Sequence, residues 1–150
     1  MKKMLLTILS LGILCSCQTQ EEIKKEQELK ELETIKEHVK NENIPENVKE
    51  WLIDSKTQKI LTILCTKESK KCEKIKSNVD ELNKEVKTYY VEIDKITEEE
   101  KDIYKKTYEL KDYTGYLPYI MLIEKNKLLV TKTDIYKLED LKKIIKKNSN

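Results

Sequence analysis

The segment Lys59–Cys65 (KILTILC) limits the possible folds of this chain more than any other stretch. It is a nearly continuous apolar run of strand length, and such a run suits a central strand that is covered on both faces. We therefore expect a sheet that holds this strand in its interior and has helices packed on both sides.

The sequence around this run supplies alternating helices and strands. Helical spacing of apolar residues predicts helices at about 45–54, from Cys72 to Leu82, at 97–110 and at 137–147, and Thr97-Glu98-Glu99-Glu100 has the pattern of a capping box. Strand-forming residues predict strands at 86–93, 119–123 and 128–131, the last two joined by a turn at 125–127. Alternating strands and helices pair in parallel through crossovers, while the late hairpin adds antiparallel strands. The expected architecture is an α/β domain with a central mixed sheet flanked by helices.

The N-terminus has the pattern of a secretory signal. Met1-Lys2-Lys3 is basic, and the apolar stretch from Met4 to Cys15 is too short to span a bilayer as a helix. Leu14-Cys15-Ser16-Cys17 resembles the lipobox of bacterial lipoproteins, which implies removal of a signal peptide 1–16 and acylation of Cys17. On this hypothesis acyl chains hold the protein on a membrane of the bacterial cell envelope, outside the cytoplasm. The alternatives are an ordinary secreted protein and an uncleaved anchor.

A charged segment follows this leader. Residues 17–44 contain few apolar side chains, and four of them follow one another at helical spacing: Leu29, Leu32, Ile35 and Val39. We expect a helical stalk or linker there. It ends at Ile44-Pro45, because a residue before proline avoids helical backbone angles. The folded domain is expected over 45–150.

Composition argues against some classes of function. The net charge of +2 falls to about zero without Lys2 and Lys3, so there is no global electrostatic case for binding nucleic acid. The only histidine is His38, in a charged helical stretch, and the expected domain contains two thiols. A structural zinc site takes four closely spaced ligands. We therefore expect neither a metal nor a cofactor.

Two motifs in this element order resemble the thioredoxin family. Ser69-Lys70-Lys71-Cys72 follows the buried strand, where thioredoxins carry Cys-x-x-Cys, so Cys72 matches the second cysteine and Ser69 stands in place of the first. Gly115-Tyr116-Leu117-Pro118 precedes an apolar strand, as the cis-proline segment of thioredoxins does. The resemblance covers about 45–147. It implies a thioredoxin-like fold, a cis Leu117–Pro118 bond, and a substrate groove at Tyr116, Leu117 and Pro118 opposite the 69–72 turn. Small thioredoxin-like proteins linked to bacteriocin transport have a similar layout.

Three positions depart from the family pattern. Ser69 replaces the exposed nucleophilic cysteine, and its hydroxyl is not ionised near neutral pH and forms no disulfide, so the usual exchange cannot run between Ser69 and Cys72. Ile63 stands at the position of the buried acidic residue that handles protons beneath the active site. Asp134 stands where thioredoxins have a glycine that lets substrate backbone approach.

Cys65 lies at the end of the buried strand, where thioredoxins usually place a tryptophan. In this fold the strand end and the helix start are neighbours, so a Cys65–Cys72 disulfide is compatible with it if the two Cα atoms lie within about 7 Å. Three interpretations of the thiols stay open. In the first, both cysteines are buried, reduced and inert. In the second they form a structural or redox-switchable bridge, and in the third Cys72, alone or together with Cys65, is a working thiol site.

Two functions are compatible with this pattern. The first is atypical thiol–disulfide chemistry in the cell envelope, with Cys72 and Cys65 as the thiols and a redox partner or extended polypeptide bound beside Pro118. The second is a redox-silent module that keeps the fold in order to bind a secreted or unfolded polypeptide. The missing cysteine at Ser69 favours the second function, and the nearness of Cys65 favours the first.

Overall fold

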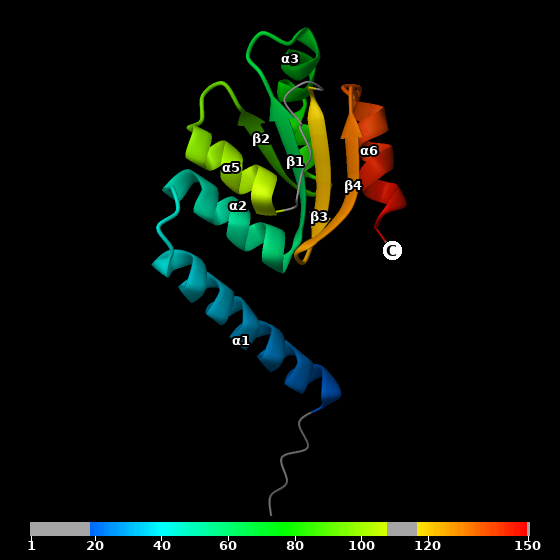
Figure 1. Ribbon diagram of the computed structural model, residues 1–150. Helices are drawn as coiled ribbons and strands as arrows, with labels where there is room; N and C mark the ends of the chain where they lie inside the picture. Colours follow the sequence, from blue (N-terminus) through cyan, green and yellow to red (C-terminus); the bar gives the residue numbers. More distant parts are fainter. Residues whose placement is uncertain (1–18, 108–116, 150) are drawn as a thin grey trace, which may run out of the picture.

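The computed structural model describes residues 19–107 and 117–149. The predicted signal peptide 1–16, Cys17 and Tyr116 lie outside these described residues. The described chain forms a four-stranded sheet with helices on both faces (Figure 1). The elements in chain order are α1 (Gln20–Asn41), α2 (Glu46–Thr57), β1 (Lys59–Cys65), α3 (Lys70–Lys76), α4 (Val79–Asn83), β2 (Lys87–Glu92), α5 (Glu98–Thr107), β3 (Tyr119–Glu124), β4 (Lys127–Thr133) and α6 (Leu138–Lys147).

The strand β1 lies inside the sheet, whose strand order is β2-β1-β3-β4. β2 runs parallel to β1 and places Glu92 opposite Cys65, while β3 runs antiparallel and places Tyr119 opposite Leu64. β3 and β4 form the predicted hairpin, whose turn has left-handed backbone at Lys125 and Asn126 (φ 45° and 65°). The mixed sheet and the interior position of β1 confirm the predicted fold class.

Side chains of β1 alternate between two apolar cores, because successive residues of a strand point to opposite faces of the sheet. Ile60 and Leu64 pack in the core under α2, α5 and the end of α1. Leu61, Ile63 and Cys65 pack in the other core, under α3, α4 and α6. The cysteine that ends β1 is therefore directed toward the face that α3 covers.

Trp51 of α2 is fully buried in the first core. Its Nε1–H donates to Thr62 Oγ1 over 2.8 Å, so each of these buried polar groups has a partner. Its ring centroid lies 4.4 Å from that of Tyr104. Val39, near the end of α1, is fully buried in the same core. The end of the charged N-terminal helix is thus part of the folded unit.

Element boundaries differ from the sequence prediction where polar side chains bond to the backbone. The helix expected from Cys72 to Leu82 is divided into α3 and α4, because the side chains of Ser77 and Asn78 donate to the Lys74 carbonyl. Side-chain bonds of this kind compete with the helical ladder. In addition, α2 continues to Thr57 and β4 spans Lys127–Thr133.

The predicted capping box at the start of α5 is present. The Thr97 N–H donates to the Glu100 carboxylate over 2.6 Å, and the Glu100 N–H donates to Thr97 Oγ1 over 3.2 Å. The Asn47 amide also donates to Glu100. The hydrogen bond from the Thr97 N–H is the main cause that lowers the pKa of the buried Glu100 carboxyl below its usual range, and the bond from Asn47 adds to it.

In the described part of the chain, no helix has both the length and the apolar character needed to cross a membrane.

Candidate functional site

Cys65 and Cys72 form a disulfide that joins the end of β1 to α3. Their Cα atoms are 5.6 Å apart, within the usual range for a disulfide, and both side chains are fully buried. The two thiols are therefore connected rather than separate. A structural bridge and a reactive pair are the interpretations compatible with this geometry.

Ser69 is the N-cap of α3. Its Oγ accepts from the Cys72 backbone N–H over 3.4 Å, and its extended backbone (φ −81°, ψ 114°) is typical of a residue that caps a helix. The Ser69 side chain is partly exposed, whereas Cys72 faces the sheet. The position that resembles the thioredoxin nucleophile thus holds a helix-capping hydroxyl, which has no redox chemistry of its own.

The edge strand β2 contacts α3 through Tyr90 and Glu92. Tyr90 Oη donates to the Cys72 carbonyl over 3.2 Å, and Glu92 forms a 2.6 Å ion pair with Lys76. Hydrogen bonds from Lys76 and Lys95 lower the pKa of Glu92 to about 2. Burial is the main cause that raises the pKa of Tyr90 to about 12. At neutral pH its hydroxyl is therefore protonated and able to donate.

A further chain of contacts connects α3 to the β3–β4 side of the sheet. Lys71 forms an ion pair with Asp134, and the Asp134 N–H donates to the Pro118 carbonyl over 3.1 Å. Asp134 has left-handed backbone (φ 61°), a conformation that aspartate tolerates better than most residues other than glycine. Lys71 and Lys74 also lie over the ring of Tyr136, with Nζ 5.7 Å and 5.3 Å from its centroid. Pro118, Asp134 and the start of α3 thus gather at one end of the sheet.

The Leu117–Pro118 bond is cis, as predicted, and Pro118 is buried. Because Tyr119 is opposite Leu64, Pro118 lies beside the end of β1 that carries Cys65. Leu117 packs partly buried against the first core. Tyr116, the third member of the predicted substrate groove, lies outside the described residues, so the groove stays a prediction.

The surroundings of the disulfide limit what it can react with. Exchange begins when a thiolate attacks one of the two sulfurs, and burial of both excludes a folded partner unless α3 moves. Ile63, which stands where thioredoxins have a proton-handling acid, is fully buried in the apolar core between Tyr90 and Ile120. Among the residues that the structure describes, no three side chains of histidine, cysteine, aspartate or glutamate are grouped to hold a metal ion.

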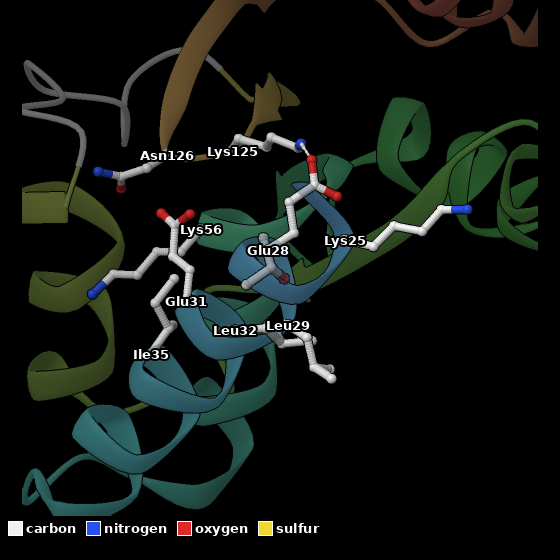
Figure 2. A pocket seen from close by; sticks show the side chains of 10 residues that line it. Lys25, Glu28, Leu29, Glu31, Leu32, Ile35, Lys56, Lys125 and Asn126 are labelled. Atoms are coloured by element: carbon white, nitrogen blue, oxygen red, sulfur yellow. Dashed lines mark ion pairs between the residues drawn. The ribbon is translucent and has the colours of Figure 1, made fainter. Parts of the chain in front are cut away.

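A different hollow, of about 700 Å³, lies between α1 and the part of the domain formed by the end of α2 and the β3–β4 turn (Figure 2). The α1 wall presents the apolar side chains of Leu29, Leu32 and Ile35, and Lys56, Lys125 and Asn126 are among the residues of the opposite wall. Lys125 Nζ lies 3.9 Å from the Glu28 carboxylate. The lining of this hollow contains no thiol and no imidazole, so none of its side chains can take part in thiol–disulfide exchange.

The contact between Tyr90 and Cys72 does not follow from the strand pattern of 86–93 alone. Alternation along a strand does predict that the adjacent Tyr89 and Tyr90 point to opposite faces. The parallel register decides which of them shares a face with α3, because it places Tyr90 opposite Ile63.

Comparisons with known proteins agree with this architecture. No protein-family model and no curated protein matches the sequence. The thioredoxin of Fasciola hepatica is similar in structure, with a TM-score of 0.51 and 16% identity over 67% of this chain and 90% of that one. Thioredoxin f2 of Chlamydomonas reinhardtii gives a TM-score of 0.48 and 16% identity, over 61% of this chain and 80% of that one. A malarial protein gives a TM-score of 0.48 and 22% identity, over 62% of this chain and 99% of that one. Together with the sheet order and the cis-proline, the similarity to the Fasciola protein identifies the fold of this chain as thioredoxin-like.

Proposed function

We propose that this chain is a thioredoxin-like protein of the bacterial cell envelope in which Cys65 and Cys72 form a two-electron redox couple. The observation that carries the proposal is their disulfide, which lies beside the cis-proline at the end of β1. Because both sulfurs belong to one chain and are already within bonding distance, the couple needs no third thiol of the protein. Ser69 serves the couple only by capping the helix that carries Cys72.

Exchange at this couple runs in two balanced steps. A thiolate of a partner dithiol attacks one protein sulfur, forms a mixed disulfide, and releases the other protein sulfur as a thiolate that takes up a proton. The second thiolate of the partner then attacks the partner's own sulfur in the mixed disulfide and releases the second protein sulfur. The partner is oxidised to a disulfide, and the protein is reduced to a dithiol by two electrons and two protons. The reverse sequence reoxidises the protein.

Ser69 and the buried sulfurs predict that the parent protein is a poor general reductase of protein disulfides. A small disulfide can reach the buried sulfurs after a smaller displacement of α3 than a protein substrate requires. We therefore expect the pre-reduced dithiol form to exchange with a small disulfide, such as oxidised glutathione, and to exchange little with a protein disulfide such as that of insulin. The small-disulfide activity should be lost in both Cys65→Ala and Cys72→Ala. A parent no more active toward the small disulfide than Cys72→Ala would contradict the proposed couple.

Restoring the missing thiol tests whether Ser69 is the defect. The double variant Ser69→Cys/Cys65→Ala contains a Cys-x-x-Cys pair and no competing thiol in the domain. Its partly exposed position 69 should raise the rate of insulin reduction by dithiothreitol at least about tenfold over the parent, because an accessible thiolate can then attack and Cys72 can resolve. The matched control is Cys65→Ala alone. An inactive double variant that keeps its fold would show that the surface beside Pro118 does not accept disulfide substrates.

The proposed location rests on the lipobox-like Leu14-Cys15-Ser16-Cys17. We expect a radiolabelled or clickable fatty acid, fed to a bacterium that expresses the chain, to label the parent and not Cys17→Ala. Cys15→Ala is the matched control, because Cys15 is removed with the signal peptide and that variant should still be labelled. Label that persists in Cys17→Ala would refute acylation at this position.

The second candidate is a redox-silent module that binds a secreted or unfolded polypeptide. The observation that favours it is the complete burial of both cysteines beneath α3, together with the absence of a thiol at Ser69. In that case the Cys65–Cys72 bridge is structural. The module then predicts polypeptide binding that is equal in the oxidised and the reduced protein.

A further inference from the structure

We infer that Tyr90 is a positioning residue for the Cys65–Cys72 couple: its hydroxyl holds α3 against the sheet, so that the two sulfurs remain close when the disulfide is open. The inference rests on the proposed redox function of this pair and adds a residue to it. Tyr90 packs against the core cluster that contains both cysteines. It acts through the Cys72 backbone, to which its hydroxyl donates over 3.2 Å.

Tyr90 is bonded directly to Cys72, the member of the couple that lies on a helix. Cys65 is fixed in the interior strand, and its carbonyl accepts from Ile93 N–H over 2.8 Å, so its position follows the sheet. Cys72 sits on a helix that ends at Lys76, and its position depends on what holds that helix to the sheet. Tyr90 stands on β2, the neighbour of β1, on the face that α3 covers.

The other contacts that hold α3 are weaker candidates for this role. The pairs Lys76–Glu92 and Lys71–Asp134 each have at least one exposed partner. Exposed ion pairs contribute little to stability, because water screens them and two long side chains must be ordered. The Tyr90 bond joins a half-buried hydroxyl to the backbone of the fully buried Cys72.

The direction of the effect follows from what the disulfide already constrains. In the oxidised protein the disulfide already fixes α3 against the sheet, so the tyrosine bond adds little further restriction to the position of α3. In the dithiol form the bridge is gone, and the tyrosine bond then holds α3 together with the packing of Cys72 and Ile75 in the second core. Removing the tyrosine bond therefore increases the conformational entropy of α3 mainly in the reduced form. The dithiol–disulfide equilibrium shifts toward the dithiol as a result. The loss of one hydrogen bond corresponds to a shift of about two- to tenfold.

The experiment measures the redox equilibrium of purified protein in a series of dithiothreitol ratios, with the thiols trapped in acid and counted by mass. Tyr90→Phe should shift the equilibrium constant toward the dithiol by about two- to tenfold. Tyr89→Phe is the matched control. It is the adjacent residue on the same strand, half-buried on the other face, and its hydroxyl donates to Asp54 over 2.6 Å. It loses a shorter hydrogen bond to a charged acceptor, and that bond lies on the face away from α3, so the redox equilibrium should be unchanged.

A second readout comes from stability. A merely structural role lowers the stability of the oxidised and reduced forms equally and does not move the redox equilibrium. By linkage, the positioning role makes the disulfide stabilise the fold less in Tyr90→Phe than in the parent. An unchanged redox equilibrium in Tyr90→Phe, or an equal shift in Tyr89→Phe, would overturn the inference. Failure of the proposed function is distinct, because it appears as a lack of turnover with small disulfides while this equilibrium is still measured.

Discussion

Replacing Trp51 by alanine is expected to lower the free energy of unfolding by about 3–5 kcal/mol, the usual cost of deleting a large buried aromatic side chain. The side chain is fully buried and lies against the ring of Tyr104. Its removal also leaves the buried Thr62 hydroxyl without the indole N–H that now donates to it. Urea denaturation followed by circular dichroism measures the change.

The matched control is Leu29→Ala. Leu29 is a large apolar residue on α1, but its exposed fraction is 56%, so its truncation should change stability by no more than about 0.5 kcal/mol. A free energy of unfolding for Trp51→Ala within about 1 kcal/mol of the parent's would contradict the core described above, because truncating a buried tryptophan typically costs about 3–5 kcal/mol.

Reducing the Cys65–Cys72 disulfide is expected to lower the free energy of unfolding by about 2–3 kcal/mol, as estimated for a closed loop of this length. The two cysteines are separated by seven positions, so the bridge restricts only a short loop of the unfolded chain. Urea denaturation with and without a phosphine reductant measures the difference.

The double variant Cys65→Ser/Cys72→Ser controls for effects of the reductant itself, because its stability should not respond to the phosphine. Equal stability of the parent with and without reductant would contradict a bridge that constrains the fold. The parent should also remain folded when reduced, because the first core contains neither cysteine and the second contains other buried apolar side chains.

The fold could be predicted because its main determinants are local. The run KILTILC is apolar at nearly every position and proved to be interior, and the capping box at Thr97 marked the start of α5. The cis bond at Pro118 followed from the family resemblance. These features depend on residues close together in the sequence, so a single sequence can indicate them.

Other features depend on contacts between distant segments. Val39 belongs to a charged helix, and its burial depends on how α1 packs against α2. The division of α3 from α4 depends on whether Ser77 and Asn78 bond to the backbone or to solvent. The bond between Tyr90 and Cys72 requires both the register of β2 and the placement of α3. Apolar spacing alone carries none of this information.

The candidate site was only partly open to prediction from sequence. The pairing of Cys65 with Cys72 was one of three interpretations, because spacing shows that two cysteines can meet and not that they do. The alternation along β1 directs Cys65 toward the face that α3 covers, and the placement of α3 brings Cys72 into bonding distance of it. The role of Ser69 as a helix cap explains why a serine is useful at a position where it cannot act as a redox nucleophile.

The most direct test of the central claim is the oxidation state of Cys65 and Cys72 in protein taken from its own compartment. Samples are quenched with acid and alkylated before purification, and the mass shows whether both domain thiols are labelled. The redox couple predicts a bridge that opens on brief exposure of the cells to dithiothreitol and closes again after washout. A bridge that stays closed in the folded protein throughout that exposure would contradict the couple and identify the disulfide as structural.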